Sequence, residues 1–235
     1  MRRVVQPELL DHLPASDPKA IRSRADLRRL NGIMGHVGIL THAFYAHVDR
    51  NAVRTRPLRI CELGSGDGSL LLKLARSWSA LGVTAEADLI DLHDLVSDET
   101  LHGFGKYNWQ ATPVTTDVVT WLDQSTEMVD VMFANLFLHH FQEAPLRELL
   151  QRVAARTNLF IACEPRRAAF ALTASHLLGL IGCNTVTRHD AAVSVRAGFN
   201  DKDLSVLWPD RDTWQLSEGP AGLFSHCFIA NRCYG

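Results

Sequence analysis

Hydrophobic side chains recur at helical spacing through the N-terminal part of the chain, from about Pro7 to Asp49. The stripe consists of Leu27, Leu30, Met34, Val37, Thr41 and Phe44. Intervals of three and four residues place such side chains on one face of a helix. Asn31-Gly32 and Gly35 interrupt the pattern, and we expect a bend or a break there because glycine has a low helix propensity.

After Pro57 the pattern changes to short apolar runs that alternate with segments of helical spacing. Strands are predicted at 58–63, 87–92, 112–116, 129–134 and 159–163, and helices at 69–78, 97–104, 118–122 and 144–156. Strands that alternate with helices indicate a parallel sheet covered on both faces. Two later runs, 213–217 and 224–230, are predicted to form an antiparallel hairpin around a loop at 218–222.

The length of 235 residues fits one α/β domain with a short accessory segment. The most apolar run, residues 168–183, contains His176 and is shorter than the about 20 residues that a membrane-spanning helix needs. We therefore predict a buried helix here and no stable membrane insertion.

Composition narrows the function classes. A formal net charge of −2 provides no positive field that would attract nucleic acid. The five cysteines are scattered without a C-x-x-C pair, so neither a disulfide framework nor a zinc knuckle is indicated. The residues after Met1 lack the apolar core of a signal peptide. We expect a protein of the reducing cytoplasm that does not bind nucleic acid.

A glycine-rich turn, Glu62-Leu63-Gly64-Ser65-Gly66-Asp67-Gly68, follows the first predicted strand. Glycines at alternate positions let the backbone approach a ligand closely. The dinucleotide fingerprint G-x-G-x-x-G has a glycine where this chain has Ser69. Glu62 would repel a pyrophosphate, whereas it suits the cationic methionine end of S-adenosylmethionine (SAM).

This turn resembles motif I of class I SAM-dependent methyltransferases, and the resemblance covers residues 57–163. It implies a Rossmann-like fold, a SAM-dependent methyltransferase activity, SAM as cofactor and S-adenosylhomocysteine (SAH) as product. It also implies that Glu62, Gly64, Ser65, Gly66 and Gly68 contact the cofactor.

Two further carboxylates are candidates for the cofactor. Asp91 closes the second predicted strand, where a carboxylate can accept hydrogen bonds from ribose hydroxyls. Asp94 is the alternative, because strand ends are uncertain by a few residues. Asp117 lies in a segment that resembles the adenine-binding part of the family, where it would accept from the adenine amine. Its other interpretation is a cap on the next helix.

The fourth predicted strand leads into Asn135-Leu136-Phe137-Leu138-His139-His140-Phe141. In class I methyltransferases this strand end lines the place where methyl donor and acceptor meet, and we assign Asn135 to the cofactor side. An imidazole of His139 or His140 can take the acceptor's proton near neutral pH. Adjacent residues cannot easily both point into one site, and the sequence does not decide between them.

Glu164 and His189 complete the catalytic candidates. Glu164 follows the fifth strand and either points into the same cleft or pairs with Arg166, Arg167 or Arg188. His189, beside Asp190, either serves the site or caps a helix. Because no H-x-x-x-H or C-x-x-C spacing is present, we predict no metal.

The segments 135–141, 164–167 and 187–191 resemble small bacterial methyltransferases of polyketide and phenolic-lipid pathways. The resemblance implies O-methylation of a small aromatic or polyketide-like hydroxyl in secondary metabolism. A carbon or nitrogen acceptor, or a non-catalytic SAM-fold binding protein, are the alternatives. Residues 1–52 are predicted as a helical cap, and 53–235 as the SAM-binding domain with a helical insertion at about 165–210. Both additions would form a lid over an apolar acceptor pocket. A homodimer is compatible with this organisation.

Overall fold

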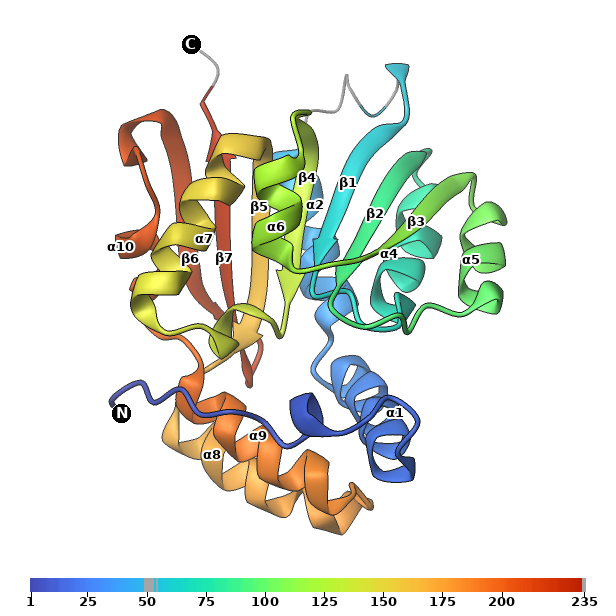
Figure 1. Ribbon diagram of the computed structural model, residues 1–235. Helices are drawn as coiled ribbons and strands as arrows, with labels where there is room; N and C mark the ends of the chain where they lie inside the picture. Colours follow the sequence, from blue (N-terminus) through green and yellow to red (C-terminus); the bar gives the residue numbers. More distant parts are fainter. Residues whose placement is uncertain (49–52, 54, 234–235) are drawn as a thin grey trace.

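The structure is a computed structural model that describes residues 1–48, 53 and 55–233. Among these residues, seven strands form one sheet in the order β3-β2-β1-β4-β5-β7-β6 (Figure 1). The strands are β1 Leu58–Leu63, β2 Ala85–Asp91, β3 Trp109–Thr115, β4 Val129–Asn135, β5 Thr157–Pro165, β6 Trp214–Ala221 and β7 Ser225–Arg232. The first five run parallel, and β7 is antiparallel to both β5 and β6. The predicted fold class is confirmed.

Helices cover both faces of the sheet. One face carries α2 His36–His47, α4 Ser69–Ser79 and α5 Asp98–Gly105, and the other carries α6 Val118–Gln124, α7 Glu143–Arg156 and α10 Asp203–Leu207. Alternate side chains of a strand enter the two layers, as the two-residue period of a strand requires. In β1, for example, Ile60 packs in the α2–α4–α5 layer and Cys61 in the α6–α7–α10 layer.

A third group of helices lies below the carboxyl ends of the parallel strands (Figure 1). It consists of η1 Leu10–His12, α1 Pro18–Ile33, α8 Ala169–His176, η3 Leu177–Ile181 and α9 Thr185–Ala197. We call this group the helical layer. Two short 3-10 turns complete the described structure, η2 Leu138–His140 after β4 and η4 Arg211–Thr213 before β6. Loops at the carboxyl ends of the strands therefore face the helical layer, where ligands bind in such sheets.

The N-terminal prediction is confirmed in part. The helix is interrupted at Gly35, whose left-handed backbone with a φ of 71° separates α1 from α2. The helical pattern predicted from about Pro7 is wrong at its start, because the first α-helix begins at Pro18 and only the short η1 precedes it. Residues 1–8 have no regular secondary structure, and the Val4 amide donates to the Arg196 carbonyl of α9. In addition, α2 packs against the sheet through Leu40 and Phe44. The predicted boundary after residue 52 falls on a residue outside those described, and so does the end at residue 235; the division into cap and domain stays a prediction.

The predicted buried helix at 168–183 is wrong in two respects. The α-helix ends at His176 and continues as η3, and the Leu180 side chain is 83% exposed. Leu177 and Ile181 are also exposed, whereas Ala171 and Ser175 are buried, so the run buries only part of its surface. No helix within the described residues is long and apolar enough to cross a membrane.

The C-terminal hairpin is tighter than predicted. The residues assigned to its loop, 218–221, belong to β6, and Glu218 pairs with Phe228. The Glu218 carboxylate is buried and accepts hydrogen bonds from the Leu204 and Ser205 amides, which fixes this part of the strand. The turn itself lies at 222–224.

Candidate functional site

The glycine turn after β1 is built from left-handed backbone. Gly64, Gly66 and Gly68 have φ values of 69°, 56° and 71°, a region that glycine enters without the cost that a Cβ imposes. Open space surrounds the position of a Cβ on Gly66, whereas a Cβ on Gly64 would lie 2.3 Å from the Phe137 ring. The turn is therefore open at Gly66 and packed against the loop after β4 at Gly64.

Replacing Gly64 by alanine should destabilise the protein by more than the backbone cost alone. That cost is about 1–2 kcal/mol for a left-handed residue, and the contact with Phe137 adds to it. Gly82→Ala is the matched control, because Gly82 has a φ of 83° and nothing within 4 Å of its Cβ position. Urea unfolding should show the larger loss for Gly64→Ala. Equal losses would contradict the packing described here.

A buried carboxylate lies at the base of the turn. The Glu62 side chain is 2% exposed, and its Oε2 has no hydrogen-bond partner among the described residues. Burial, together with the nearby Asp67 and Asp91, raises the pKa of Glu62 well above its usual range. A positively charged ligand would relieve this concentration of carboxylates, whereas a pyrophosphate would add to it. The dinucleotide interpretation is therefore disfavoured by the geometry as well as by the motif.

Asp91 and Asp94 differ in position. Asp91 is the last residue of β2, and its two oxygens accept from the amides of Gly66 and His93 at 2.8 and 2.9 Å. Each carboxylate oxygen retains a second lone pair for a ligand. Asp94 lies in the exposed segment that follows. The geometry favours Asp91 as the residue that faces the turn.

Three other predicted cofactor residues lie around the same edge of the sheet. Asp117 caps α6 through Oδ1, which accepts from the amides of Val119 and Thr120, so the capping role is present and Oδ2 is not used in it. The side chains of Ser65 and Asn135 are buried, and neither side-chain oxygen has a hydrogen bond within the described part of the chain. Orphaned buried polar atoms of this kind indicate a ligand site.

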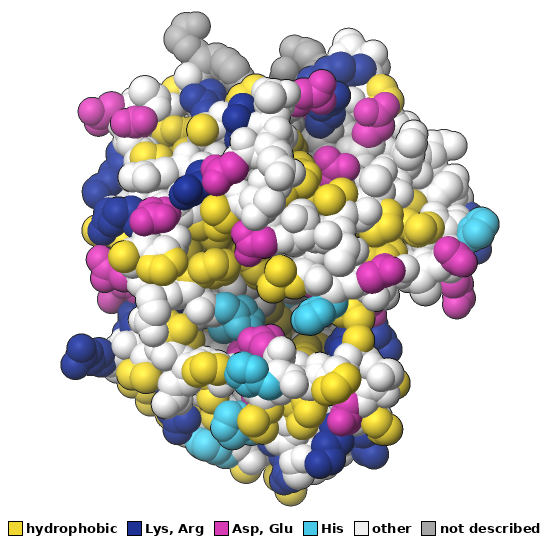
Figure 2. Space-filling model, viewed as in Figure 1, with side chains coloured by type: hydrophobic (Ala, Val, Ile, Leu, Met, Phe, Trp, Pro, Cys, Tyr) yellow, Lys and Arg dark blue, Asp and Glu magenta, His cyan; other side chains and the backbone are white. Residues whose placement is uncertain are grey.

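An apolar cavity of about 270 Å³ opens between the loop after β4 and the helical layer. In Figure 2 a hollow is visible between the sheet and the lower helices, with histidine side chains at its rim. Its apolar walls include Leu27, Leu30, Met34, Ala171, Leu178 and Val195. This volume is near the lower end of the ~300–1,000 Å³ typical of small-molecule pockets. Leu178 lines the cavity, whereas Phe44 of α2 stacks on Trp78 in the core.

One wall of the cavity is polar, and Glu164 and His139 form its buried support. Glu164 is completely buried, and its Oε1 accepts from the amides of Phe137 and Leu138 at 3.0 and 2.8 Å. Its Oε2 lies 2.8 Å from His139 Nδ1. The alternative of an ion pair between Glu164 and Arg166, Arg167 or Arg188 is not found among the described residues. Glu164 instead fixes the loop after β4 and the ring of His139.

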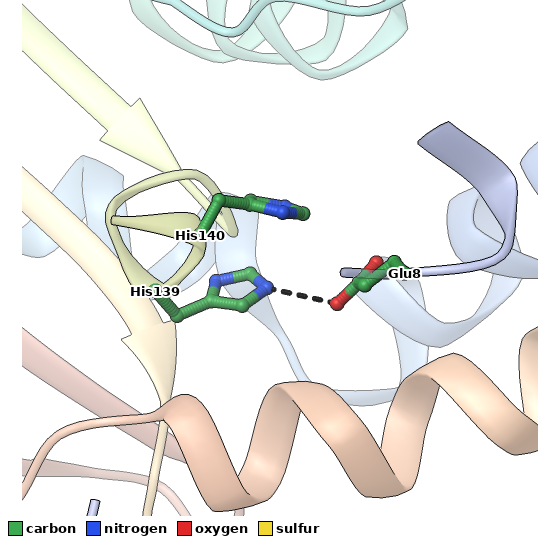
Figure 3. Close-up of side chains that lie close together, drawn as sticks. All are labelled: Glu8, His139 and His140. Carbon is green, nitrogen blue, oxygen red and sulfur yellow. Dashed lines mark hydrogen bonds and ion pairs between the residues drawn. The ribbon is translucent and has the colours of Figure 1, made fainter. Parts of the chain in front are cut away.

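His139 is held from both sides. Its Nε2 lies 3.2 Å from Glu8 Oε1 (Figure 3). Glu8 also accepts a hydrogen bond from the Ser194 hydroxyl. Burial alone would lower the pKa of His139, but hydrogen bonds with Glu164 and Glu8 outweigh burial and raise that pKa to about 9. Both ring nitrogens are therefore occupied by carboxylates.

His140 is less constrained. Its ring is partly exposed, and Nδ1 lies 3.4 Å from Asp11 Oδ2, which leaves Nε2 without a carboxylate partner in the described residues. Both His140 and Asp11 line the cavity.

Between this wall and the glycine turn, Leu136 lines the cavity in a left-handed conformation with a φ of 54°. Such a conformation is costly for leucine, and strained residues cluster at functional sites.

His189 lies apart from this wall. Its side chain is half-exposed, it does not line the cavity, and Nδ1 lies 2.9 Å from Asp190 Oδ1. Asp190 accepts from the amides of Leu9 and Leu10 at 2.8 and 3.0 Å, so it caps η1 rather than its own helix. This capping places the neighbouring Glu8 at the cavity.

Glu8 and Asp11 are the residues that motif reasoning missed. Glu8 is 131 positions from its partner His139 along the chain, and no local spacing connects the two. His36 was also missed; it is fully buried, and burial lowers its pKa to about 4 although Asn135 beside it acts in the opposite direction. In the sequence, Glu8 stands out only as a charged residue in an N-terminal segment without a clear pattern.

No protein-family model and no curated protein matches the sequence. Solved structures with a similar fold include the plantazolicin methyltransferase BamL, in complex with a triazolic desmethylPZN analog and SAH. It has a TM-score of 0.63 and 14% identity, over 92% of this chain and 92% of that one. An O-methyltransferase family protein from Burkholderia thailandensis has a TM-score of 0.61 and 18% identity, over 94% of this chain and 62% of that one.

The magnesium protoporphyrin IX methyltransferase from Synechocystis PCC 6803, with bound SAH, has a TM-score of 0.51 and 16% identity, over 86% of this chain and 84% of that one. At these identities the likenesses concern the fold alone. The chain has the fold of class I SAM-dependent methyltransferases, and the expected resemblance is confirmed at that level.

Proposed function

We propose that this protein is a SAM-dependent methyltransferase that methylates a hydroxyl of a small, apolar or aromatic acceptor. One observation carries the proposal: the loop after β4 joins a carboxylate-lined glycine turn to an apolar cavity. Phe137 of that loop packs on Gly64, and Leu136 lines the cavity. Donor and acceptor would therefore meet at this loop.

The residues around the turn fit SAM. The open backbone at Gly66 accommodates a ligand, the unpartnered Glu62 carboxylate suits a cationic amino acid end, and Asp91 suits ribose hydroxyls. Asp117 and Asn135 complete the set proposed to hold the adenine and the methionine. When bound, SAM supplies the methyl group from its sulfonium.

The polar wall of the cavity is proposed to orient the acceptor and take its proton. His139 is poorly suited to accept a proton, because carboxylates already engage both ring nitrogens. The Nε2 of His140 has no carboxylate partner in the described part of the chain and His140 lines the cavity, so we assign the base to His140, with Asp11 orienting its ring. Glu164 and Glu8 act through His139 as positioning residues, and His189 has no part in this assignment.

The helical layer is proposed to exclude water from the transfer. Arg28 of α1 forms an ion pair of 2.6 Å with Asp67 of the glycine turn, and Leu27 and Leu30 of the same helix line the cavity. An apolar wall beside the turn would hold the two reactants together and so favour displacement at the sulfonium methyl. A cytoplasmic location, a homodimer and a role in secondary metabolism stay predictions from the sequence.

Asp91→Ala should weaken SAM binding by about 1–3 kcal/mol, because charge-assisted hydrogen bonds to the ribose are lost. Asp94→Ala is the control and should leave the affinity unchanged, since Asp94 lies in the exposed segment beyond the strand. Isothermal titration calorimetry on both variants measures the difference. The reverse order of effects would assign the ribose to Asp94 and overturn this placement.

A non-catalytic SAM-binding protein is the competing proposal. The polar wall opposes it, because a cavity that served only for binding would not require His140, paired with Asp11 alone in the described residues, next to a histidine held by two carboxylates. Incubation with radiolabelled SAM and a panel of small phenols tests the choice. Methyl transfer to a phenol supports the enzyme, and SAM binding without any transfer across phenol, amine and carbon acceptors supports the binding protein.

A further inference from the structure

Although the sequence spacings predict no metal, we propose that Glu8, His139 and His140 form a binding site for one divalent transition metal ion, with Zn²⁺ as the probe of choice. Each residue offers one ligand atom, and these atoms all lie within 4.8 Å of one another. Figure 3 shows both imidazole rings directed to the same side, toward the carboxylate of Glu8. The site lies at the polar wall of the cavity.

The ligand set matches the chemistry of zinc. Two imidazoles and one carboxylate are the protein ligands of several catalytic zinc sites, which keep a further position open. At metal–ligand distances of about 2.0–2.2 Å, tetrahedral ligands lie roughly 3.3–3.6 Å apart. His139 Nε2 and Glu8 Oε1 already lie at 3.2 Å, so only the His140 ring has to approach.

The outer contacts are those that a metal site needs. A histidine that binds metal usually gives its other ring N–H to a carboxylate, which fixes the ring orientation. The Glu164 carboxylate occupies that position on His139, at 2.8 Å from Nδ1, and is itself completely buried. Asp11 lies on Nδ1 of His140, and the Ser194 hydroxyl donates to Glu8. Each of the three ligands therefore has its own supporting partner.

The binding of the ion does not depend on the proposed function, whereas the catalytic role of the ion does. All three ligands line the cavity, so the open coordination position faces the acceptor. There the ion would bind the acceptor's oxygen and lower the pKa of its hydroxyl, as zinc does for water. The proton passes to Asp11 or to solvent, and the oxygen then forms its bond to the methyl group as the sulfonium–methyl bond breaks. In the loaded protein His140 is a ligand, and the ion replaces it as the means of deprotonation.

The test is a Zn²⁺ titration of tag-free, chelator-stripped protein in competition with a chromophoric chelator. We expect one ion per chain. Glu8→Gln and His140→Gln should each weaken binding at least tenfold, and Glu164→Gln by about 10–100-fold as a supporting partner. His102→Gln is the control and should have no effect, because His102 is an exposed histidine on α5.

Absence of a stoichiometric site, or unchanged binding in both Glu8→Gln and His140→Gln, overturns the inference. Circular dichroism identifies any variant that does not fold. If a variant does not fold, the visible absorption of Co²⁺ bound to the wild-type protein is the deciding measurement. Nitrogen and oxygen ligands give a spectrum without thiolate charge transfer, and this is the spectrum that the proposed site predicts. Calorimetry with SAM on the metal-free protein separates the two proposals. SAM binding without Zn²⁺ binding overturns only the metal site, and Zn²⁺ binding without SAM binding supports the metal site and overturns the proposed function.

Discussion

Glu164→Ala is expected to destabilise the protein by about 3–5 kcal/mol, the range found when one partner of a buried ion pair is removed. The substitution leaves His139 facing Glu8 alone and removes the acceptor for the Phe137 and Leu138 amides. Burial on its own would raise the pKa of Glu164, but His139 and these amides outweigh burial and lower it. The ionised carboxylate therefore supports the loop after β4.

Urea unfolding followed by circular dichroism measures this loss. Glu148→Ala is the matched control, because Glu148 forms an exposed pair with Arg152 and such pairs contribute about 0–1 kcal/mol. Glu164→Gln should fall between the two, since an amide oxygen can still accept from the backbone. A loss for Glu164→Ala no larger than for the control would show that Glu164 does not hold the loop.

His140→Gln is expected to reduce turnover by about 10²–10⁴-fold in the metal-free protein while the affinity for SAM stays unchanged. The reason is that His140 is assigned the acceptor's proton, and it lies on the cavity wall rather than at the glycine turn. Single-turnover kinetics with a phenol acceptor, alongside calorimetry with SAM, measures both quantities.

His189→Gln is the matched histidine control for turnover, and it should be silent because the side chain is half-exposed and lies outside the cavity. If His140→Gln lowered SAM affinity and turnover equally, His140 would have a structural role. If His189→Gln caused the larger loss in turnover, the catalytic base would have to be assigned to α9 instead of to the loop after β4.

The fold around the glycine turn was predictable because it is local. The strand at 58–63 was placed with its observed bounds, and the glycines predicted to form a turn after it have left-handed backbone. Apolar runs and two-residue alternation depend only on near neighbours. The Asp91 assignment needed one further fact, the end of β2, which the structure supplies.

The acceptor side was less predictable because long-range contacts decide it. Glu8 reaches the site only because Asp190 caps η1 from a distant helix, and no sequence pattern records that contact. The apolar run at 168–183 has the composition of a buried helix, but it forms an outer layer with one solvated face. The separate environments of His139 and His140 likewise depend on Glu164, Glu8 and Asp11.

The turn at Glu62–Gly68 is proposed to bind SAM. Calorimetric titration of the wild-type protein with SAM and SAH, with NAD as the comparison ligand, tests it most directly. We predict one molecule of SAM or SAH per chain and no heat from NAD, because the carboxylates of Glu62, Asp67 and Asp91 favour a cationic ligand and oppose a pyrophosphate. No binding at millimolar SAM, or binding of NAD instead, would contradict the assignment of this turn to SAM.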